Sequence, residues 1–550
     1  MNPRVLRPRT VPPGSAGVPA GESLDESGSD SPHSSHITNV THVTFVTPAT
    51  FATLALLLLL LILTLSNTSA ASPVGLFEST TDIGAPALTG SATYDPAAQE
   101  YELAGAGANM WAARDEFRFV WKKMKGDFIL RTRVDFVGKS AEPHRKVGWM
   151  IRSSLDFDSA YADCAEHGDG LTSLQFRRTK GATTEQVLLA VTNTDVLQLE
   201  RKGGSYIFSA ARYGEPFTKG EVPALDLGDE VYVGLFICSH GSNRLEKAKF
   251  RDVRIIRPAW DGLVPYRDYL GSQLEILEPQ TGKLRLIHTS TEPFEAPNWT
   301  RDGKALIYNI SGKGARSGRL CRFDLATKDA ALLDTGPAKK NNNDHVLSFD
   351  GSLLGISDQT EGGSKVFVVP CNGGTPKRIT SVAPSYLHGW SPDGKFLVYT
   401  GKRGDSFDIY RIGSDGGDEV RLTSEGMNDG SEYSPDGKDI YFNSTRSGSM
   451  QIWRMDSNGK HQEQVTKDEF NNWFPHISPD GKWIAFITFT KDVPANDHPY
   501  YKQVYLRMMP ADGGTPKIIA YVYGGQGTMN VPSWSPDSTK IAFVSNTINE

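Results

Sequence analysis

The stretch Trp390-Ser-Pro-Asp-Gly394 leads into Phe396-Leu-Val-Tyr399, and the same five-residue motif returns as Tyr433-Ser-Pro-Asp-Gly437 and Ile477-Ser-Pro-Asp-Gly481. Three looser copies are Trp299-Thr-Arg-Asp-Gly303, Leu347-Ser-Phe-Asp-Gly351 and Trp534-Ser-Pro-Asp-Ser538. The six aspartates stand at 302, 350, 393, 436, 480 and 537, so the repeat has a period of 43 to 57 residues. Proline presets φ, aspartate bonds nearby amides and glycine ends the turn without steric cost. We therefore expect a tight hairpin turn at each copy.

Each period holds enough alternating sequence for four strands. An aliphatic residue stands four positions after each aspartate and a second large apolar residue two positions further, which indicates a strand with one buried face. A second hairpin follows, as in Asp408-Ile-Tyr-Arg-Ile412 and Arg421-Leu-Thr-Ser424. Four strands per repeat are typical of a propeller blade.

The ends of the repeat region complement each other. An outer pair, Gln273–Leu277 and Leu284–His288, precedes the first turn motif, and an inner pair around Trp534 and Ile541–Val544 comes last. Pairing the two completes six blades and covers both strand edges. The predicted fold class is all-β, with a six-bladed β-propeller over residues 259–550 whose ring closes between the first and last hairpins.

These repeats resemble the TolB propeller and its relatives, which carry WD-like repeats. The resemblance covers about residues 265–550, and Asn472-Trp-Phe-Pro-His-Ile-Ser-Pro-Asp-Gly481 is similar to one branch of the group. It implies a fold and a general preference for protein partners. The chain departs from TolB by placing a β-domain where TolB has an α/β domain, so TolB's own partners do not transfer.

Residues 72–258 predict an antiparallel jelly-roll sandwich. Strand-like runs such as Phe128–Phe136, Lys146–Arg152 and Glu230–Ile237 follow one another across short turns, with no long helical period. The segments Gly148-Trp-Met-Ile-Arg-Ser153 and Arg201-Lys-Gly-Gly-Ser-Tyr206 resemble the concanavalin-A/laminin-G-like jelly rolls. That resemblance implies binding of sugars or calcium.

The amino terminus predicts export. Residues 1–50 are rich in Ser, Thr, Pro and Gly and are expected to be disordered. The apolar run Phe51–Leu65 and the small residues up to Ala71 make residues 51–71 a signal peptide, with an uncleaved signal anchor as the alternative. The chain is therefore expected in the periplasm or outside the cell, and it touches a membrane only through this segment if the segment is retained.

Composition excludes several function classes. The 550 residues carry 58 Lys and Arg against 64 Asp and Glu, a net charge of −6, so no basic field is available to hold nucleic acid. The four cysteines never approach as Cys-x-x-Cys, which argues against a zinc knuckle, a thioredoxin motif and a disulfide scaffold. No cofactor is evident, although a divalent metal, calcium or a transition ion, is compatible with the candidate residues below.

Polar residues just ahead of the turns are the candidate ligand site of the propeller channel. They are Asn298, His345, His388, Glu432, His476 and Asn530, with Asp344 and Asp429 nearby. Three histidines and a carboxylate from different blades can ring a metal or face an acidic sugar. The competing interpretation is a hydrated channel wall, because residues four and five positions ahead of a turn face opposite sides of a strand unless a bulge intervenes.

Two further segments carry chemistry-bearing residues. Asp163 and Asp169 lie in an acidic stretch of the sandwich and are candidate calcium ligands, with an ordinary solvated turn as the competing interpretation. The insertion Thr490–Lys502 contains His498 and Tyr500 and is interpreted as a tolerated insertion, with ligand binding as the alternative.

Three functions remain open. The leading hypothesis is an exported, non-catalytic binding or scaffold protein of the cell envelope that recognises a glycan or an envelope protein through both domains. The second is a carbohydrate-active enzyme, such as a metal-dependent polysaccharide lyase that uses the propeller channel. The third is a Tol-like envelope transport component.

Overall fold

The computed structural model describes residues 73–548, and every regular element within them is a β-strand. The predicted leader 1–50 and the apolar segment 51–71 lie outside this range. In the described part of the chain, no helix has the length and apolar character needed to cross a bilayer.

Residues 73–256 form two seven-stranded antiparallel sheets and one small hairpin. The first sheet has the order β1 (Ser79–Ile83), β6 (Phe117–Lys125), β15 (Glu230–Cys238), β8 (Lys146–Arg152), β9 (Tyr161–His167), β10 (Thr172–Arg177) and β11 (Glu185–Leu188). The second has the order β14 (Thr218–Val222), β13 (Ser205–Ala211), β12 (Val196–Lys202), β7 (Phe128–Val137), β16 (Gly241–Ile256), β3 (Glu100–Gly107) and β2 (Ser91–Asp95). The hairpin joins β4 (Met110–Trp111) and β5 (Arg114–Asp115).

One hydrophobic core draws side chains from both sheets. It contains Val120 and Trp149 of the first sheet together with Leu103, Leu130 and Leu199 of the second. Alternation along each strand sends these residues to one face. The concanavalin-A/laminin-G-like relationship itself stays a prediction.

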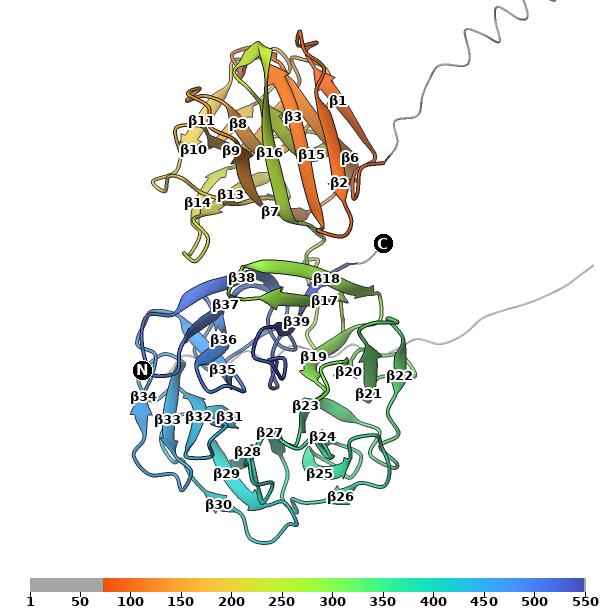
Figure 1. Ribbon diagram of the computed structural model, residues 1–550, viewed down its shortest axis with the longest axis vertical. Coiled ribbons are helices and arrows are strands. Elements are labelled where there is room, and N and C mark those ends of the chain that lie inside the picture. The colour runs from red at the N-terminus through yellow and green to blue at the C-terminus, as the bar shows by residue number, and fades with distance from the viewer. Residues whose placement is uncertain (1–72, 549–550) are drawn as a thin grey trace, which may run out of the picture. The chain divides into compact units, whose positions relative to one another are not determined.

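Residues 271–547 form the six-bladed propeller that the repeats predict, with blades arranged around a central channel (Figure 1). Five blades have four strands each, ordered from the channel outward. They are β19 (Phe294–Trp299), β20 (Ala305–Ile310), β21 (Arg319–Asp324) and β22 (Ala330–Leu332); β23 (Asn341–Leu347), β24 (Leu353–Asp358), β25 (Lys365–Pro370) and β26 (Lys377–Arg378); β27 (Ser385–Trp390), β28 (Phe396–Arg403), β29 (Ser406–Gly413) and β30 (Val420–Arg421); β31 (Asn428–Tyr433), β32 (Asp439–Ser444), β33 (Gln451–Asp456) and β34 (Glu463–Gln464); and β35 (Asn471–Ile477), β36 (Trp483–Phe489), β37 (Lys502–Pro510) and β38 (Lys517–Gly524).

The remaining sheet combines strands from both ends of this region. Its order is β18 (Lys283–Ser290), β17 (Gly271–Glu278) and β39 (Ile541–Thr547). Strand β17 pairs with β39 from Gly271 opposite Thr547 to Leu277 opposite Ile541. A single bridge between Trp534 and Ile541 extends the sheet toward the channel.

All six turn motifs share one hydrogen bond. The Ser or Thr hydroxyl donates to Oδ1 of the aspartate two residues later, over 2.5 to 2.7 Å. In the third motif, Oδ1 of Asp393 also accepts from the amide of Lys395 at 3.1 Å. The aspartate thus satisfies donors that the tight turn leaves without strand partners.

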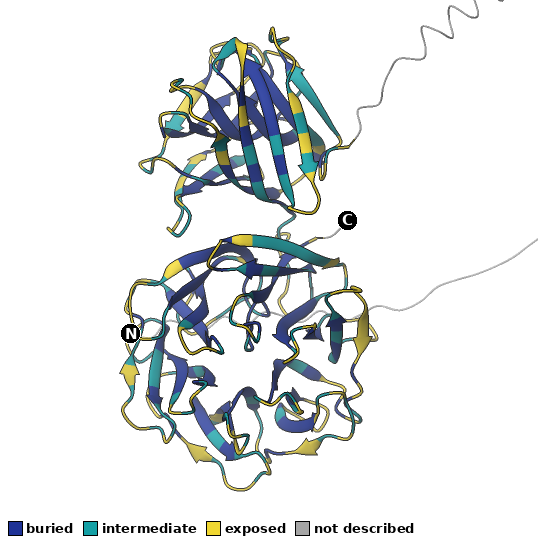
Figure 2. Cartoon of the chain, viewed as in Figure 1, coloured by how far each residue is buried: buried dark blue, intermediate teal, exposed yellow. Residues whose placement is uncertain are grey.

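In several blades burial falls with distance from the channel, although the outermost strand β38 is buried along most of its length (Figure 2). Inner strands such as β19 and β35 are buried along their whole length, whereas the outermost β22, β26 and β30 are exposed. The polar residues of the inner strands are therefore held among closely packed blades.

Candidate functional site

A β-bulge interrupts the inner strand of each four-stranded blade. The register shifts between Glu295 and Asn298, Asn341 and His345, Leu387 and Gly389, Asp429 and Glu432, and Trp473 and His476. Ala296 and Phe474, at two of these bulges, have φ of 56° and 53°, an uncommon conformation for residues with a side chain. A bulge turns the side chains before it relative to those after it.

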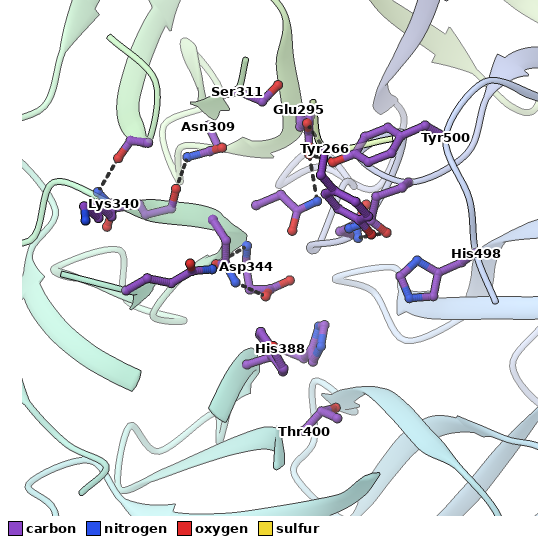
Figure 3. A pocket seen from close by; sticks show the side chains of 18 of the residues that line it. Tyr266, Glu295, Asn309, Ser311, Lys340, Asp344, His388, Thr400, His498 and Tyr500 are labelled. Atoms are coloured by element: carbon purple, nitrogen blue, oxygen red, sulfur yellow. Dashed lines mark hydrogen bonds between the residues drawn. The ribbon is translucent and has the colours of Figure 1, made fainter. Parts of the chain in front are cut away.

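Side chains before and within these bulges, together with residues of other segments, line a cavity of about 800 Å³ in the propeller. Carboxyl, imidazole and phenol groups around it come from Glu295, Asp344, His388, Asp429, His498, Tyr266, Tyr269, Tyr386 and Tyr500. Amides come from Asn309, Asn341, Asn342, Asn343, Asn530, Gln359 and Gln526. Figure 3 shows Glu295, Asp344, His388 and His498 around the same opening.

His388 and Asp429 form a buried pair on one wall. The Nε2 atom of His388 lies 3.1 Å from Oδ1 of Asp429, which also accepts from the Thr400 hydroxyl at 2.6 Å and the Gly430 amide at 2.8 Å. Burial favours the neutral form of both groups, but their mutual attraction outweighs it, so the pKa of His388 is raised and that of Asp429 is lowered. This wall therefore carries a compensated charge pair.

Asp344 and Glu295 sit in a different electrostatic environment. Burial raises the pKa of Asp344 to about 7, partly offset by the positive charge of His388. Burial likewise raises the pKa of Glu295. Glu295 accepts from the Asn343 amide at 2.8 Å and from the Tyr500 hydroxyl at 3.2 Å, and Asp344 accepts from the Asn342 amide at 2.8 Å. These donors are neutral.

The insertion at 490–502 supplies part of the wall. Tyr500 packs edge-on against Tyr266 and Tyr269, with ring centroids 5.3 and 6.3 Å apart. His498 packs against Trp473 at 4.4 Å, and its Nε2 lies 4.0 Å from Oδ2 of Asp429. The insertion therefore contributes an imidazole and a phenol to the cavity.

Comparison with known proteins identifies the family of the propeller. Residues 389–498 match the family model of the TolB β-propeller domain. An uncharacterised protein of Agrobacterium fabrum is 46% identical over 276 residues, which cover 50% of this chain and 92% of that protein. This chain belongs to the TolB-like β-propeller family.

Two solved structures resemble this TolB-like protein. One is a putative TolB from Agrobacterium tumefaciens, 45% identical, with 51% of this chain and 99% of that chain covered and a TM-score of 0.48. The other is TolB from Acinetobacter baumannii, 22% identical, with coverages of 46% and 64% and a TM-score of 0.37.

The TolB-like propeller divides the six candidate residues of the sequence among three environments. His388 and Asn530 line the cavity. Asn298 and Glu432 line a second hollow of about 230 Å³ beside the turn motifs. His345 and His476 are buried, with Nε2 of each against a backbone carbonyl, of Ile307 at 3.1 Å and Met529 at 3.2 Å. Nδ1 of His476 also lies 2.7 Å from Oε2 of Glu432, so the structure does bring these two candidates together. Across the described residues, no three His, Cys, Asp or Glu side chains come close enough together to hold a metal ion.

The two candidate calcium ligands in residues 73–256, Asp163 and Asp169, differ in burial and in hydrogen bonding. Asp163 is fully buried in β9, opposite Gln175 of β10, and neither carboxylate oxygen has a hydrogen-bond partner among the described residues. Asp169 lies in the following turn and accepts from the amide of Leu171 at 3.1 Å. The structure therefore gives them separate surroundings.

Glu295 and Tyr266 line the cavity but are not among the residues predicted from the sequence. The signal for Glu295 was present, because it precedes its turn aspartate by seven positions, as Asp429 does. Most of the predicted candidates stand four or five positions ahead of the aspartate, and of those only His388 lines the cavity. Tyr266 precedes the first repeat, so no periodicity pointed to it.

Proposed function

We propose that this protein is an exported, non-catalytic binding protein that holds a glycan in its propeller cavity. One observation carries the proposal: a cavity of about 800 Å³ is lined by several amides and by tyrosine rings. Sites for small ligands have volumes of about 300–1,000 Å³ and combine apolar faces with a few convergent polar groups. Sugars offer hydroxyls to amides and C–H faces to aromatic rings.

In this proposal, the blades hold the cavity in shape and the domain before the propeller adds a second binding surface. A ring sealed by the first and last hairpins keeps the cavity walls in place, and the concanavalin-A-like domain offers a second platform to a glycan or an envelope protein. The protein acts in the periplasm or outside the cell, without nucleic acid.

Calorimetric titration of the whole protein with a panel of glycans tests the proposal. Tyr266 is 68% exposed, so Tyr266→Ala should leave the fold intact. We expect it to weaken glycan binding roughly two- to twelvefold, the equivalent of about 0.5–1.5 kcal/mol for an aromatic contact. Phe157→Ala, at an exposed aromatic residue away from the cavity lining, is the control and should bind normally.

The alternatives give different results in the same samples. A metal-dependent lyase would release unsaturated products from a uronate polymer when a divalent ion is added. A Tol-like transport component would bind envelope proteins and leave the glycan panel untouched. Either result contradicts the proposal.

A further inference from the structure

Two carboxyl groups in the cavity lack a cationic partner. Asp429 is compensated by His388, but no ion pair within residues 73–548 involves Glu295 or Asp344. Both are buried, with 5% and 6% of their surface exposed. Buried carboxylates are normally paired with a cation, because desolvation of a lone negative charge is costly.

The remaining charged groups of the cavity do not fill this role. Asp344 is influenced by His388, Asp429 and Glu295 on neighbouring blades, and the imidazole of His388 already bonds Asp429. Lys340, which lines the cavity, is exposed and forms no ion pair within residues 73–548. The carboxyl groups of Glu295 and Asp344 are thus left without a cation, and a cation placed beside them would favour their ionised form.

Tyrosine rings stand beside the same wall. Tyr500 donates its hydroxyl to Glu295 and packs against Tyr266 and Tyr269. Aromatic faces attract cations, and here Tyr266 is exposed while Tyr500 is half-buried. A carboxylate adjoining several tyrosine rings is the combination that recognises an ammonium group.

The amides of the wall also favour a ligand that donates hydrogen bonds. Asn343 lines the cavity and donates its side-chain amide to Glu295 at 2.8 Å. Its amide oxygen is a further acceptor beside that carboxyl group. An ammonium group brings three donors and no acceptor, so it suits a wall of carboxylate and amide oxygens.

We propose that the glycan held in this cavity carries a free amino group, and that Glu295 and Asp344 bind it as an ammonium ion beside Tyr266 and Tyr500. This inference rests on the proposed function and narrows its ligand to amino sugars that are not N-acetylated. Figure 3 shows Glu295, Tyr266 and Tyr500 together on one side of the opening, with Asp344 nearby.

Isothermal titration of the whole protein with glucosamine oligosaccharides, and with the same oligosaccharides fully N-acetylated, tests this assignment near neutral pH. We expect the amino form to bind at least about tenfold more tightly, a difference of about 1.4 kcal/mol. Glu295→Gln keeps the shape of the side chain and should abolish most of that preference. Asp344→Asn provides the second variant if Glu295→Gln does not fold.

Glu221→Gln removes an exposed carboxyl of β14 and is the matched control, which should keep the full preference. Equal binding of both oligosaccharide forms would overturn the ammonium assignment and leave the glycan-binding function standing. A preference that survives in both Glu295→Gln and Asp344→Asn would overturn the role of these residues. Binding to neither form nor to any other glycan would contradict the proposed function itself.

Discussion

The three acidic residues of the cavity, Asp429, Asp344 and Glu295, differ in pKa because their surroundings differ. Asp429 has His388 beside it and is held ionised, whereas burial raises the pKa of Asp344 to about 7 and also raises that of Glu295. A group poised near neutral pH responds strongly to a charge brought close to it. The proton on Asp344 is therefore a sensitive reporter of the proposed ligand.

Binding of a glucosamine oligosaccharide should release a proton at neutral pH. The ammonium group favours the ionised carboxylate and lowers the pKa of Asp344, so the fraction of Asp344 still protonated must lose its proton on binding. Ionisation of Asp344 strengthens binding as the pH rises, whereas loss of the ligand's own ammonium proton weakens it, so affinity should pass through a maximum near neutral pH. Titrations in two buffers of different ionisation enthalpy measure the net protons released, and Asp344→Asn should release fewer protons than the unsubstituted protein. Equal proton release by the two proteins would contradict this linkage.

At the level of elements, the bulges of the inner strands decide which residues reach the cavity. In β31 the bulge passes through Gly430, whose φ is +62°. A Cβ atom there would lie 2.5 Å from Oδ1 of Asn443 and 2.8 Å from Cδ1 of Phe474. The absence of a side chain is thus required both by the backbone conformation and by the neighbouring blade.

Gly430→Ala should destabilise the propeller more than an equivalent change at an uncrowded turn. Gly404, with φ of +69° and no atom within 4 Å of a Cβ, is the matched control for backbone strain alone. We expect the free energy of unfolding to fall by about 1–3 kcal/mol more in Gly430→Ala than in Gly404→Ala, the usual cost of overpacking. Urea denaturation measures the difference. Equal losses in the two variants would show that the contacts around Gly430 relax freely.

On the scale of the whole molecule, one sheet joins strands far apart in the sequence. Leu274 of β17 lies opposite Val544 of β39, and both are buried in one hydrophobic cluster. Contacts with so large a sequence separation carry a high loop-closure cost, which packing between these strands must offset. The cavity walls depend on this arrangement.

A double-mutant cycle between Leu274→Val and Val544→Ala tests whether these strands pair in solution. Directly opposed residues should show an interaction free energy of about 0.5–1 kcal/mol in urea denaturation. Leu274→Val combined with Leu397→Val, in a separate blade and cluster, should instead be additive within about 0.5 kcal/mol. Additivity in the first pair would argue against pairing between β17 and β39.

The sequence by itself determined the all-β class and the six blades, because Ser-Pro-Asp-Gly chemistry and two-residue alternation act within a few residues of each other. It also marked Asp344 and Asp429 as polar residues near the channel, whereas His498 and Tyr500 were interpreted as part of a tolerated insertion, with ligand binding as the alternative. Only the tertiary structure decided that Glu295, Asp344, His388 and Asp429 share a cavity while His345 and His476 do not. The physical reason is that the bulges insert one extra residue into β19, β27, β31 and β35 and two into β23, which changes the side chains that face inward, and packing between blades sets these shifts.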